Sequence, residues 1–141
     1  MLVLFPEGAN FTFERRMFSL RKLSRKGRRR EAAEGGQMAH VMPPHPTGAL
    51  VALNANPTAD VIFGAHTGLG LAAFPRELWR DTPIGATFRS RMWLVPADQR
   101  PTDPDEQVRW IYDWWTRIDD WIDQAGSEPS APRVAVRRPA A

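Results

Sequence analysis

The chain has 141 residues and no cysteine, with 43% hydrophobic and 25% charged residues, proportions typical of a single globular domain. The lack of cysteine excludes disulfides, thiolate metal sites, iron–sulfur clusters and a cysteine nucleophile. No apolar run approaches the ~20 residues that span a bilayer, and no basic stretch precedes the first apolar run, so we expect neither a membrane span nor a signal peptide.

The net charge of +3 conceals an asymmetry along the chain. Residues 1–58 carry a net charge of +5, residues 59–126 carry −4, and residues 127–141 carry +2. All nine cations of the first part fall between Arg15 and Arg30. A partner that is attracted by positive charge is therefore expected at that one segment.

The first apolar run is Leu2–Phe5, and Pro6-Glu7-Gly8 stops it at once. Continuous strand formers bounded by turn residues predict a buried, parallel strand. Apolar residues then recur at helical spacing with cations on the other faces, which predicts one basic amphipathic helix over residues 13–34 that Gly35-Gly36 ends. The apolar positions are Phe13, Met17, Leu20 and Leu23.

The middle of the chain predicts three further strands and a helix. Val41-Met42 is a candidate short strand, and Thr47 is a suitable N-cap for a helix that runs through Leu53. The apolar run Val61–Ala65 predicts a second buried strand. From Thr87 to Val95 apolar and polar residues alternate, which predicts a half-exposed strand near a sheet edge.

The last predicted helix starts at Asp103 or Asp105 and is rich in tryptophan. Its apolar stripe should face the sheet, and its aspartates should form the exposed face. The stripe comprises Val108, Ile111, Trp115, Ile118 and Ile122, and the aspartates are Asp113, Asp119, Asp120 and Asp123. Residues 127–141 contain three prolines and no aromatic residue, so we expect a disordered tail after a domain of residues 1–126.

Strands that alternate with helices predict an α/β fold, with a mixed or mostly parallel sheet and helices packed on it. The tryptophan-rich helix has two interpretations, a core helix and an interfacial membrane anchor. Six acids against two arginines between Asp105 and Asp123 favour the core, because anionic lipid would repel them.

The cationic segment has three interpretations: a solvated helix face, attraction to anionic lipid headgroups or a phosphorylated substrate, and nucleic acid. Nucleic-acid domains usually spread cations over a face and interleave aromatic residues for stacking. Here the following 68 residues are net acidic, and the six tryptophans lie in stretches with core patterning. We therefore expect no nucleic-acid partner.

The histidines and one glycine-rich stretch offer less specific patterns. His40, His45 and His66 occur in no metal-ligating spacing, and no G-x-S-x-G marks a serine nucleophile. We therefore expect no metal site. Gly68–Ala73 matches G-x-G-x-x-A, but Pro75 restricts the helix start that a dinucleotide site needs, so a glycine-rich turn after a strand is the better interpretation.

Leu2-Val3-Leu4-Phe5-Pro6-Glu7-Gly8 resembles the F-P-E-G motif of the lysophosphatidic acid acyltransferase family of glycerophospholipid acyltransferases. The following segments keep the family's order and are most similar to the lysocardiolipin acyltransferase branch, over residues 1 to about 125. These segments are Asn10-Phe11-Thr12, the basic helix, His40–Pro44 with Thr47-Gly48, Asp60-Val61-Ile62, Arg89–Pro96 and the acidic tryptophan-bearing helix.

The resemblance implies part of an α/β acyltransferase core that transfers an acyl chain from acyl-coenzyme A or acyl carrier protein to a lysophospholipid, with no further cofactor. It implies a cytoplasmic protein, peripheral at the inner face of the cell membrane. The family's F-P-E-G segment lines the acceptor site, and a glycine there lets a headgroup approach the backbone. The implied substrate-binding residues are Phe5, Pro6, Glu7, Gly8 and Asn10.

Three departures from the family pattern affect the site. Ala9-Asn10 stands in place of the usual Thr-Arg, and His45 follows Pro44 in place of arginine. Because both changes remove a cation, Arg15 or Arg16 is our candidate for the acceptor's phosphate. The family's H-x-x-x-x-D motif is missing, since His45, Leu50 and Leu71 stand five residues after the three histidines.

The sequence thus predicts the C-terminal half of an acyltransferase, without catalytic residues of its own and inactive without a missing N-terminal half. The alternative, from another class, is a non-catalytic module that binds anionic lipid or phosphate through the basic helix 13–34.

Overall fold

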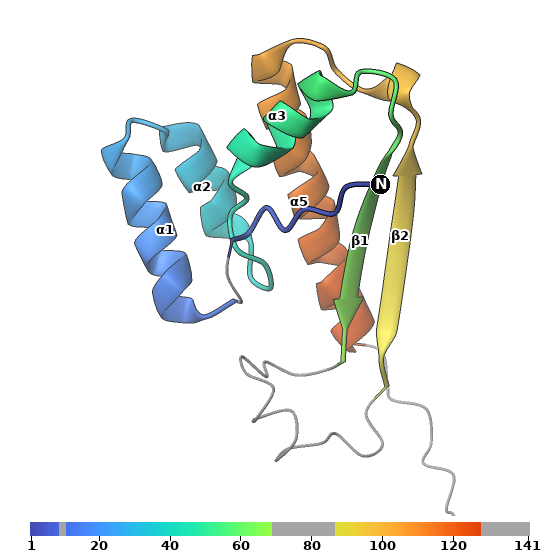
Figure 1. The fold of residues 1–141 in the computed structure, drawn as a ribbon. Coiled ribbons are helices and arrows are strands. Elements are labelled where there is room, and N and C mark those ends of the chain that lie inside the picture. Colours follow the sequence, from blue (N-terminus) through green and yellow to red (C-terminus); the bar gives the residue numbers. More distant parts are fainter. Residues whose placement is uncertain (9–10, 69–86, 128–141) are drawn as a thin grey trace, which may run out of the picture.

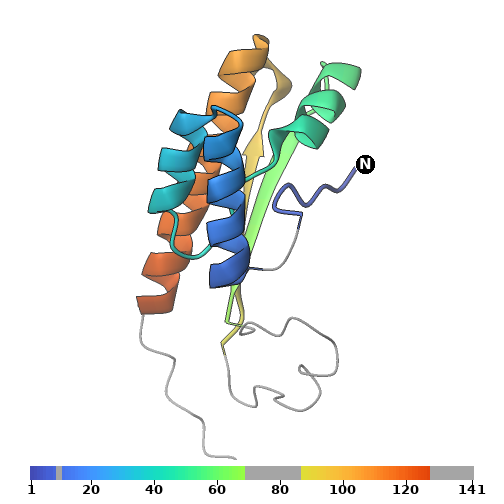
Figure 2. The ribbon, with the colours of Figure 1, turned by 90° about the vertical axis from the view of Figure 1, so that its left-hand side faces the viewer.

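Helices stack in succession on one side of a small two-stranded sheet (Figure 1). The computed structural model describes residues 1–8, 11–68 and 87–127. α5 packs on β1, α2 packs on α5, and α1 packs on α2, so that α1 is outermost (Figures 1 and 2). The elements are α1 (Phe13–Arg25), α2 (Arg29–Gln37), α3 (Pro46–Ala55), β1 (Val61–Thr67), β2 (Arg89–Val95), the 3₁₀ helix η1 (Ala97–Gln99) and α5 (Pro104–Ser127).

The sheet is antiparallel, so the predicted mixed or mostly parallel sheet is wrong for the residues that the structure describes. β1 pairs with β2 from Val61 opposite Val95 to Thr67 opposite Arg89. The segment Leu2–Phe5, expected as a buried parallel strand, forms no strand, and its side chains are exposed. Val41-Met42 lies in a loop. An apolar run forms a buried strand only where another strand lies beside it, and the sequence pattern of the run does not show whether such a partner exists.

The odd-numbered residues of the sheet face the core, and the even-numbered residues face away from α5. Phe63 and Val95 are buried against α5, whereas Ile62, Met92 and Leu94 are more than half exposed. By the residues that the structure describes, β1 is therefore covered on one face only, and the expectation of a buried strand is wrong for its other face. The half-exposed strand predicted for residues 87–95 is confirmed by β2. Its orientation differs from the pattern, because the apolar residues Met92 and Leu94 are exposed while Trp93 and Val95 face the core.

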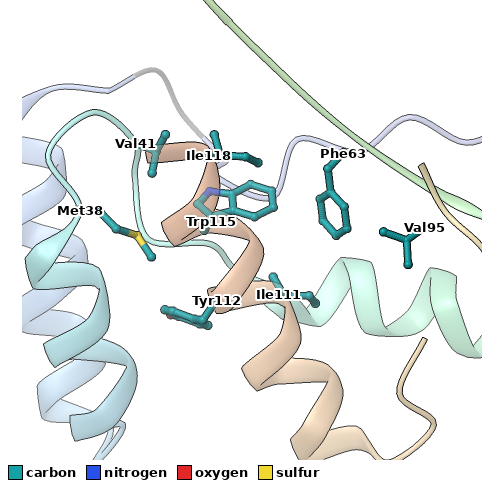
Figure 3. Close-up of a cluster of buried hydrophobic side chains, with 8 residues drawn as sticks. All are labelled: Met38, Val41, Phe63, Val95, Ile111, Tyr112, Trp115 and Ile118. Atoms are coloured by element: carbon teal, nitrogen blue, oxygen red, sulfur yellow. The ribbon is translucent and has the colours of Figure 1, made fainter. Parts of the chain in front are cut away.

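α5 supplies four of the eight residues of the buried core, in line with its predicted apolar stripe. Ile111, Trp115 and Ile118 are buried together with residues from β1, β2 and the loop after α2 (Figure 3). The Phe63 ring stacks on Trp114 with centroids 4.5 Å apart. The helix begins as expected at Asp103, whose carboxylate accepts the N–H groups of the first turn at 2.9 and 3.0 Å.

The predicted single helix over residues 13–34 is two helices, because Gly27 ends the first. Gly27 has a φ of +74°, a left-handed conformation that glycine adopts without strain. Its N–H bonds to the Ser24 carbonyl at 3.1 Å, and the Arg28 N–H bonds to the Leu23 carbonyl at 3.0 Å. This pair of bonds is the Schellman motif that closes a helix. α2 then runs back along α1 and passes through Gly35-Gly36 to Gln37.

α3 starts at Pro46, with His45 at the N-cap position, and not after Thr47 as the sequence predicts. Proline suits the first turn because its missing N–H and its fixed φ cost nothing there. At the other end, the Arg100 guanidinium donates to the carbonyls of Leu53 at 3.0 Å and Asn56 at 3.3 Å. Arg100 thus links the C-terminal end of α3 to the segment after β2 by hydrogen bonds.

Some of the predictions concern residues that the structure does not describe. The glycine-rich stretch from Leu69 onward and residues 128–141 are not described, while Ser127 is the last residue of α5. Of the helices that the structure describes, none has the length and apolarity to cross a membrane.

Gly35 and Gly36 form a matched pair for testing the packing of α2. A Cβ at Gly35 would lie 2.7 Å from Cγ of Pro43 and 3.2 Å from Cδ2 of Leu20, whereas a Cβ at Gly36 would meet nothing within 4 Å. We expect Gly35→Ala to lower the free energy of unfolding by about 1–3 kcal/mol, because it overpacks a closed contact. Gly36→Ala should raise it by about 0.5–1 kcal/mol through helix propensity. Urea titration measures both, and equal effects would contradict this packing.

Candidate functional site

The segment Phe5-Pro6-Glu7-Gly8 forms a tight turn, and the turn carries the predicted acceptor-binding residues. The Gly8 N–H donates to the Phe5 carbonyl at 3.1 Å. Proline at the second position of the turn presets its φ, and Gly8 at the fourth has a φ of +68°. A side chain at Gly8 would be strained there and would approach Cδ2 of His45 at 3.5 Å. The four residues therefore form one rigid unit that projects Glu7.

The loop between α2 and α3 is held by two carboxylates. Three consecutive backbone N–H groups, those of Ala39, His40 and Val41, donate to Asp119 of α5 at 2.6–3.1 Å. The next N–H group, that of Met42, donates to the Glu7 carboxylate at 3.4 Å. Successive N–H groups that converge in this way form a concave site for an anion, and here the protein fills it with its own carboxylates.

The turn is bound to the same loop through its backbone. The His45 N–H donates to the Pro6 carbonyl at 2.7 Å, and the hydroxyl of the buried Tyr112 donates to the Pro44 carbonyl at 3.3 Å. Every backbone N–H group of loop residues 39–45 is thus bonded, either to α5 on one side or to the turn on the other. These contacts fix the position of Glu7 relative to His45.

A pocket of about 490 Å³ opens where the turn, the loop and α1 meet. Of the seven predicted substrate-binding residues, Glu7, Gly8 and Arg15 line it. Phe5 is 84% exposed outside the lining, and Pro6 contributes the carbonyl that binds His45. Arg16 donates instead to the Gly36 carbonyl at 2.7 Å, and Asn10 lies outside the described residues. The remaining lining residues are Glu14, Phe18, Ser19, Met42 and His45.

Burial and neighbouring charge shift the pKa values of two lining residues, Glu7 and His45, in opposite directions. Burial raises the pKa of Glu7 above its ordinary value, and the nearby Asp119 carboxylate adds to the rise. The Met42 N–H opposes it, as does the indole N–H of Trp115, which makes no hydrogen bond of normal geometry. Burial lowers the pKa of His45, and the cations Lys22, Arg28 and Lys26 lower it further. The pocket therefore favours a neutral imidazole at His45, where the cations of α1 and of the segment after it are felt.

Of the polar groups that line the pocket, those of Glu7, Gly8 and Arg15 suit a ligand with a hydroxyl and an anionic group. The Glu7 carboxyl accepts a hydrogen bond when ionised and donates one when protonated. Arg15 supplies a guanidinium, the group that binds phosphate oxygens most effectively. Gly8 leaves the backbone open to close approach on the same side.

Among residues 1–8, 11–68 and 87–127 one histidine–aspartate pair forms, and it lies away from the pocket. Nε2 of His40 is 3.1 Å from the Asp123 carboxylate, and neither residue lines the pocket. His66 packs against the Phe88 ring with centroids 5.7 Å apart. Within the described ranges, no group of three or more histidine, aspartate or glutamate side chains could hold a metal ion.

Sequence reasoning missed Asp119 and the place of His45. Asp119 was assigned to the exposed face of the last helix, and this is wrong, because the residue is only 7% exposed. Its position beside Ile118 at the margin of the apolar stripe was the available signal. His45 follows a Pro-Pro pair in a segment that carries the family resemblance. The sequence therefore pointed to this segment but could not show that His45 lies beside the turn and α1.

No protein-family model matches the sequence, and no curated protein or solved structure is significantly similar to it. The function must therefore be inferred from the residues and their arrangement.

Asp119→Ala tests the carboxylate that holds the loop. The substitution leaves three backbone N–H groups without their acceptor, so we expect the free energy of unfolding to fall by about 2–3 kcal/mol. Asp119→Asn keeps one acceptor oxygen and should lose less. Asp120→Ala removes the neighbouring exposed carboxylate and should stay within about 0.5 kcal/mol of the parent. Similar losses at residues 119 and 120 in a urea titration would contradict the loop's dependence on Asp119.

Glu7→Gln tests the buried carboxyl through the pH dependence of stability. Because the folded state raises the pKa of Glu7 above 4.5, it holds the proton more tightly than the unfolded chain does. The stabilisation is therefore complete below the unfolded pKa and is lost as the pH rises through the folded pKa. Glu7→Gln removes this loss, so the variant should gain stability relative to the parent between about pH 4 and about pH 7.

Urea titrations at the two pH values measure this difference, and Glu106→Gln in the exposed first turn of α5 is the control for removing one carboxyl. A stability difference between the parent and Glu7→Gln that does not change with pH would contradict the burial of Glu7.

Proposed function

We propose that the pocket binds the polar end of a lysophospholipid, such as 1-acyl-glycerol-3-phosphate, as the acyl acceptor of an acyltransferase. The supporting observation is that the F-P-E-G turn and the loop of residues 39–45, far apart in the sequence, meet around one pocket that Arg15 also lines. The acyl donor is acyl-coenzyme A or acyl carrier protein. The protein belongs at the inner face of the cell membrane, where such acceptors are found, as a peripheral protein of phospholipid synthesis or remodelling.

Each of the three predicted site residues that line the pocket has a role in this proposal. Glu7 accepts a hydrogen bond from a glycerol hydroxyl, and Gly8 lets the glycerol approach the backbone. Arg15 binds the phosphate, taking the place of the cations that the family usually has after F-P-E-G and in the later block. His45 stands at the second of these positions, and its lowered pKa limits its charge. Arg15 is therefore the main anion-binding residue of the pocket.

Acyl transfer needs a base that takes the hydroxyl proton as the new bond forms. In the hydrolytic triads a histidine does this, oriented by an aspartate. His45 lines the pocket, but no described aspartate lines it beside His45. Asp60 accepts the Ala97 N–H at 3.0 Å instead. We propose that the base belongs to a segment outside this sequence, so that this chain supplies the acceptor-binding half.

The first test is binding of a short-chain, water-soluble lysophosphatidic acid, followed by calorimetry. Arg15→Ala should weaken binding at least tenfold, since a charge-assisted bond to phosphate contributes about 1.5–3 kcal/mol. Glu7→Ala should also weaken it, while Arg109→Ala on the exposed side of α5 should not. The matching monoacylglycerol, without phosphate, should bind weakly to every variant. Equal binding by the parent and Arg15→Ala would overturn the acceptor assignment.

The second measurement is acyl transfer from a labelled acyl-coenzyme A, which the chain alone should not catalyse above the buffer control. Transfer that disappears in His45→Ala or His66→Ala would show that the chain carries its own base. Vesicle binding that needs Arg21, Lys22, Arg25 and Lys26, with no binding of the soluble acceptor, would favour the alternative of a non-catalytic lipid-binding module.

A further inference from the structure

α1 carries an exposed phenylalanine in the middle of its basic outer face. Ser19 and Leu23 are buried on the side of α1 that packs on α2, and the opposite side looks outward from the molecule (Figure 2). On that outer side Phe18 is 68% exposed. Exposure of a large aromatic side chain is not unusual by itself, so its surroundings decide what it means.

Three cations surround Phe18 on the helix surface. Arg21, Lys22 and Arg25 follow it at i+3, i+4 and i+7, the positions that share one helix face, and all three are exposed. Glu14 is the only acid of α1. Lysine and arginine around an exposed aromatic residue are the pattern of a helix that lies in the interface of an anionic bilayer, with the ring at headgroup depth.

The same residue also lines the pocket. Phe18, Glu14 and Arg15 of α1 form part of its wall, so the outer face of α1 and the mouth of the pocket are contiguous. A bilayer that contacts this face would lie beside the pocket and would keep the acyl chain of a bound lysophospholipid out of water.

We propose that the outer face of α1 docks on an anionic lipid bilayer with Phe18 inserted between the headgroups, and that the acceptor enters the pocket directly from this bilayer. This inference rests on the proposed function for the acceptor's identity, but the docking itself depends only on α1. Charge complementarity favours an anionic membrane over a neutral one, because each cation near such a surface contributes attraction.

Phe13 provides a matched control on the same helix. It is 67% exposed, but its next-turn neighbours are Arg16, which is bound to the Gly36 carbonyl, and the half-buried Met17. Phe13→Ala and Phe18→Ala thus remove equally exposed rings with different surroundings. We expect Phe18→Ala to weaken partitioning onto vesicles of phosphatidylcholine mixed with phosphatidylglycerol about tenfold, and Phe13→Ala to leave it within about twofold.

Arg25→Glu should weaken the same partitioning at least fivefold, since one cation near the surface contributes about that factor. Arg109→Glu makes the same charge change on α5 and should have little effect. Partitioning of the parent should fall steeply as salt is raised, and vesicles of phosphatidylcholine alone should bind it weakly.

The absence of cysteine allows a direct measurement of insertion. Phe18→Cys and Phe13→Cys can each be labelled with an environment-sensitive fluorophore. A label at residue 18 should shift to the blue when anionic vesicles are added, and a label at residue 13 should not. Circular dichroism of each variant checks that α1 is still folded.

Four outcomes would overturn the proposal: no vesicle binding, equal binding to neutral and anionic vesicles, equal losses for Phe18→Ala and Phe13→Ala, and Phe18-dependent binding of an oligonucleotide with none to vesicles. Because the vesicles contain no lysophospholipid, none of these outcomes bears on the soluble-acceptor measurement that tests the pocket. Loss of the soluble-acceptor binding with vesicle docking intact would instead remove the acceptor assignment and leave the docking face.

Discussion

The Asp119 carboxylate fixes the loop on which the candidate site depends. It accepts N–H groups from three consecutive residues of that loop, and the following N–H goes to Glu7. A buried carboxylate is stable only when it is well hydrogen-bonded, so the loop backbone and the carboxylate stabilise each other. Ile111, Trp115 and Ile118 anchor α5 in the core. Because the loop is bonded to α5, the most buried of the described helices, α5 fixes the position of the loop.

This arrangement also explains why the pocket has a weakly acidic carboxyl and a weakly basic imidazole side by side. The turn brings Glu7 under the loop, where burial and the charge of Asp119 disfavour ionisation. The loop brings His45 toward the cations of α1 and the segment after it, where protonation is disfavoured. Opposite shifts in neighbouring groups are a feature of functional sites as well as of structural ion networks. Here they leave Arg15 as the charged donor of the pocket.

The sequence predicted the elements that depend on local pattern and failed where distant residues decide. The stripe of α5, a helix start at Asp103 or Asp105 and a strand over residues 87–95 follow from periodicity and capping, and all are confirmed. The apolar face of β2 is nevertheless the exposed one. The prediction of a parallel sheet was wrong, because the residues of a strand do not determine which strand pairs with it or in which direction. Gly27 could have indicated the end of α1, but the helical periodicity of the residues on both sides of it favoured one continuous helix. The sequence alone could not show which of the seven predicted site residues line the pocket, because this depends on how the turn packs beside α1. In the structure Arg15 lines the pocket, whereas Arg16 donates to a carbonyl of α2.

The uncovered face of the sheet affects how the protein behaves at high concentration. Within the described ranges each of β1 and β2 pairs with one strand and has one unpaired edge, and the exposed Ile62, Met92 and Leu94 lie on one face of this pair. Unpaired backbone groups next to exposed apolar side chains are a template for intermolecular strand addition. Storage of the chain at high concentration therefore favours the addition of extended segments such as Leu2–Phe5 from one copy to the sheet of another. A lysine at Met92 or Leu94 would oppose this self-association without entering the core.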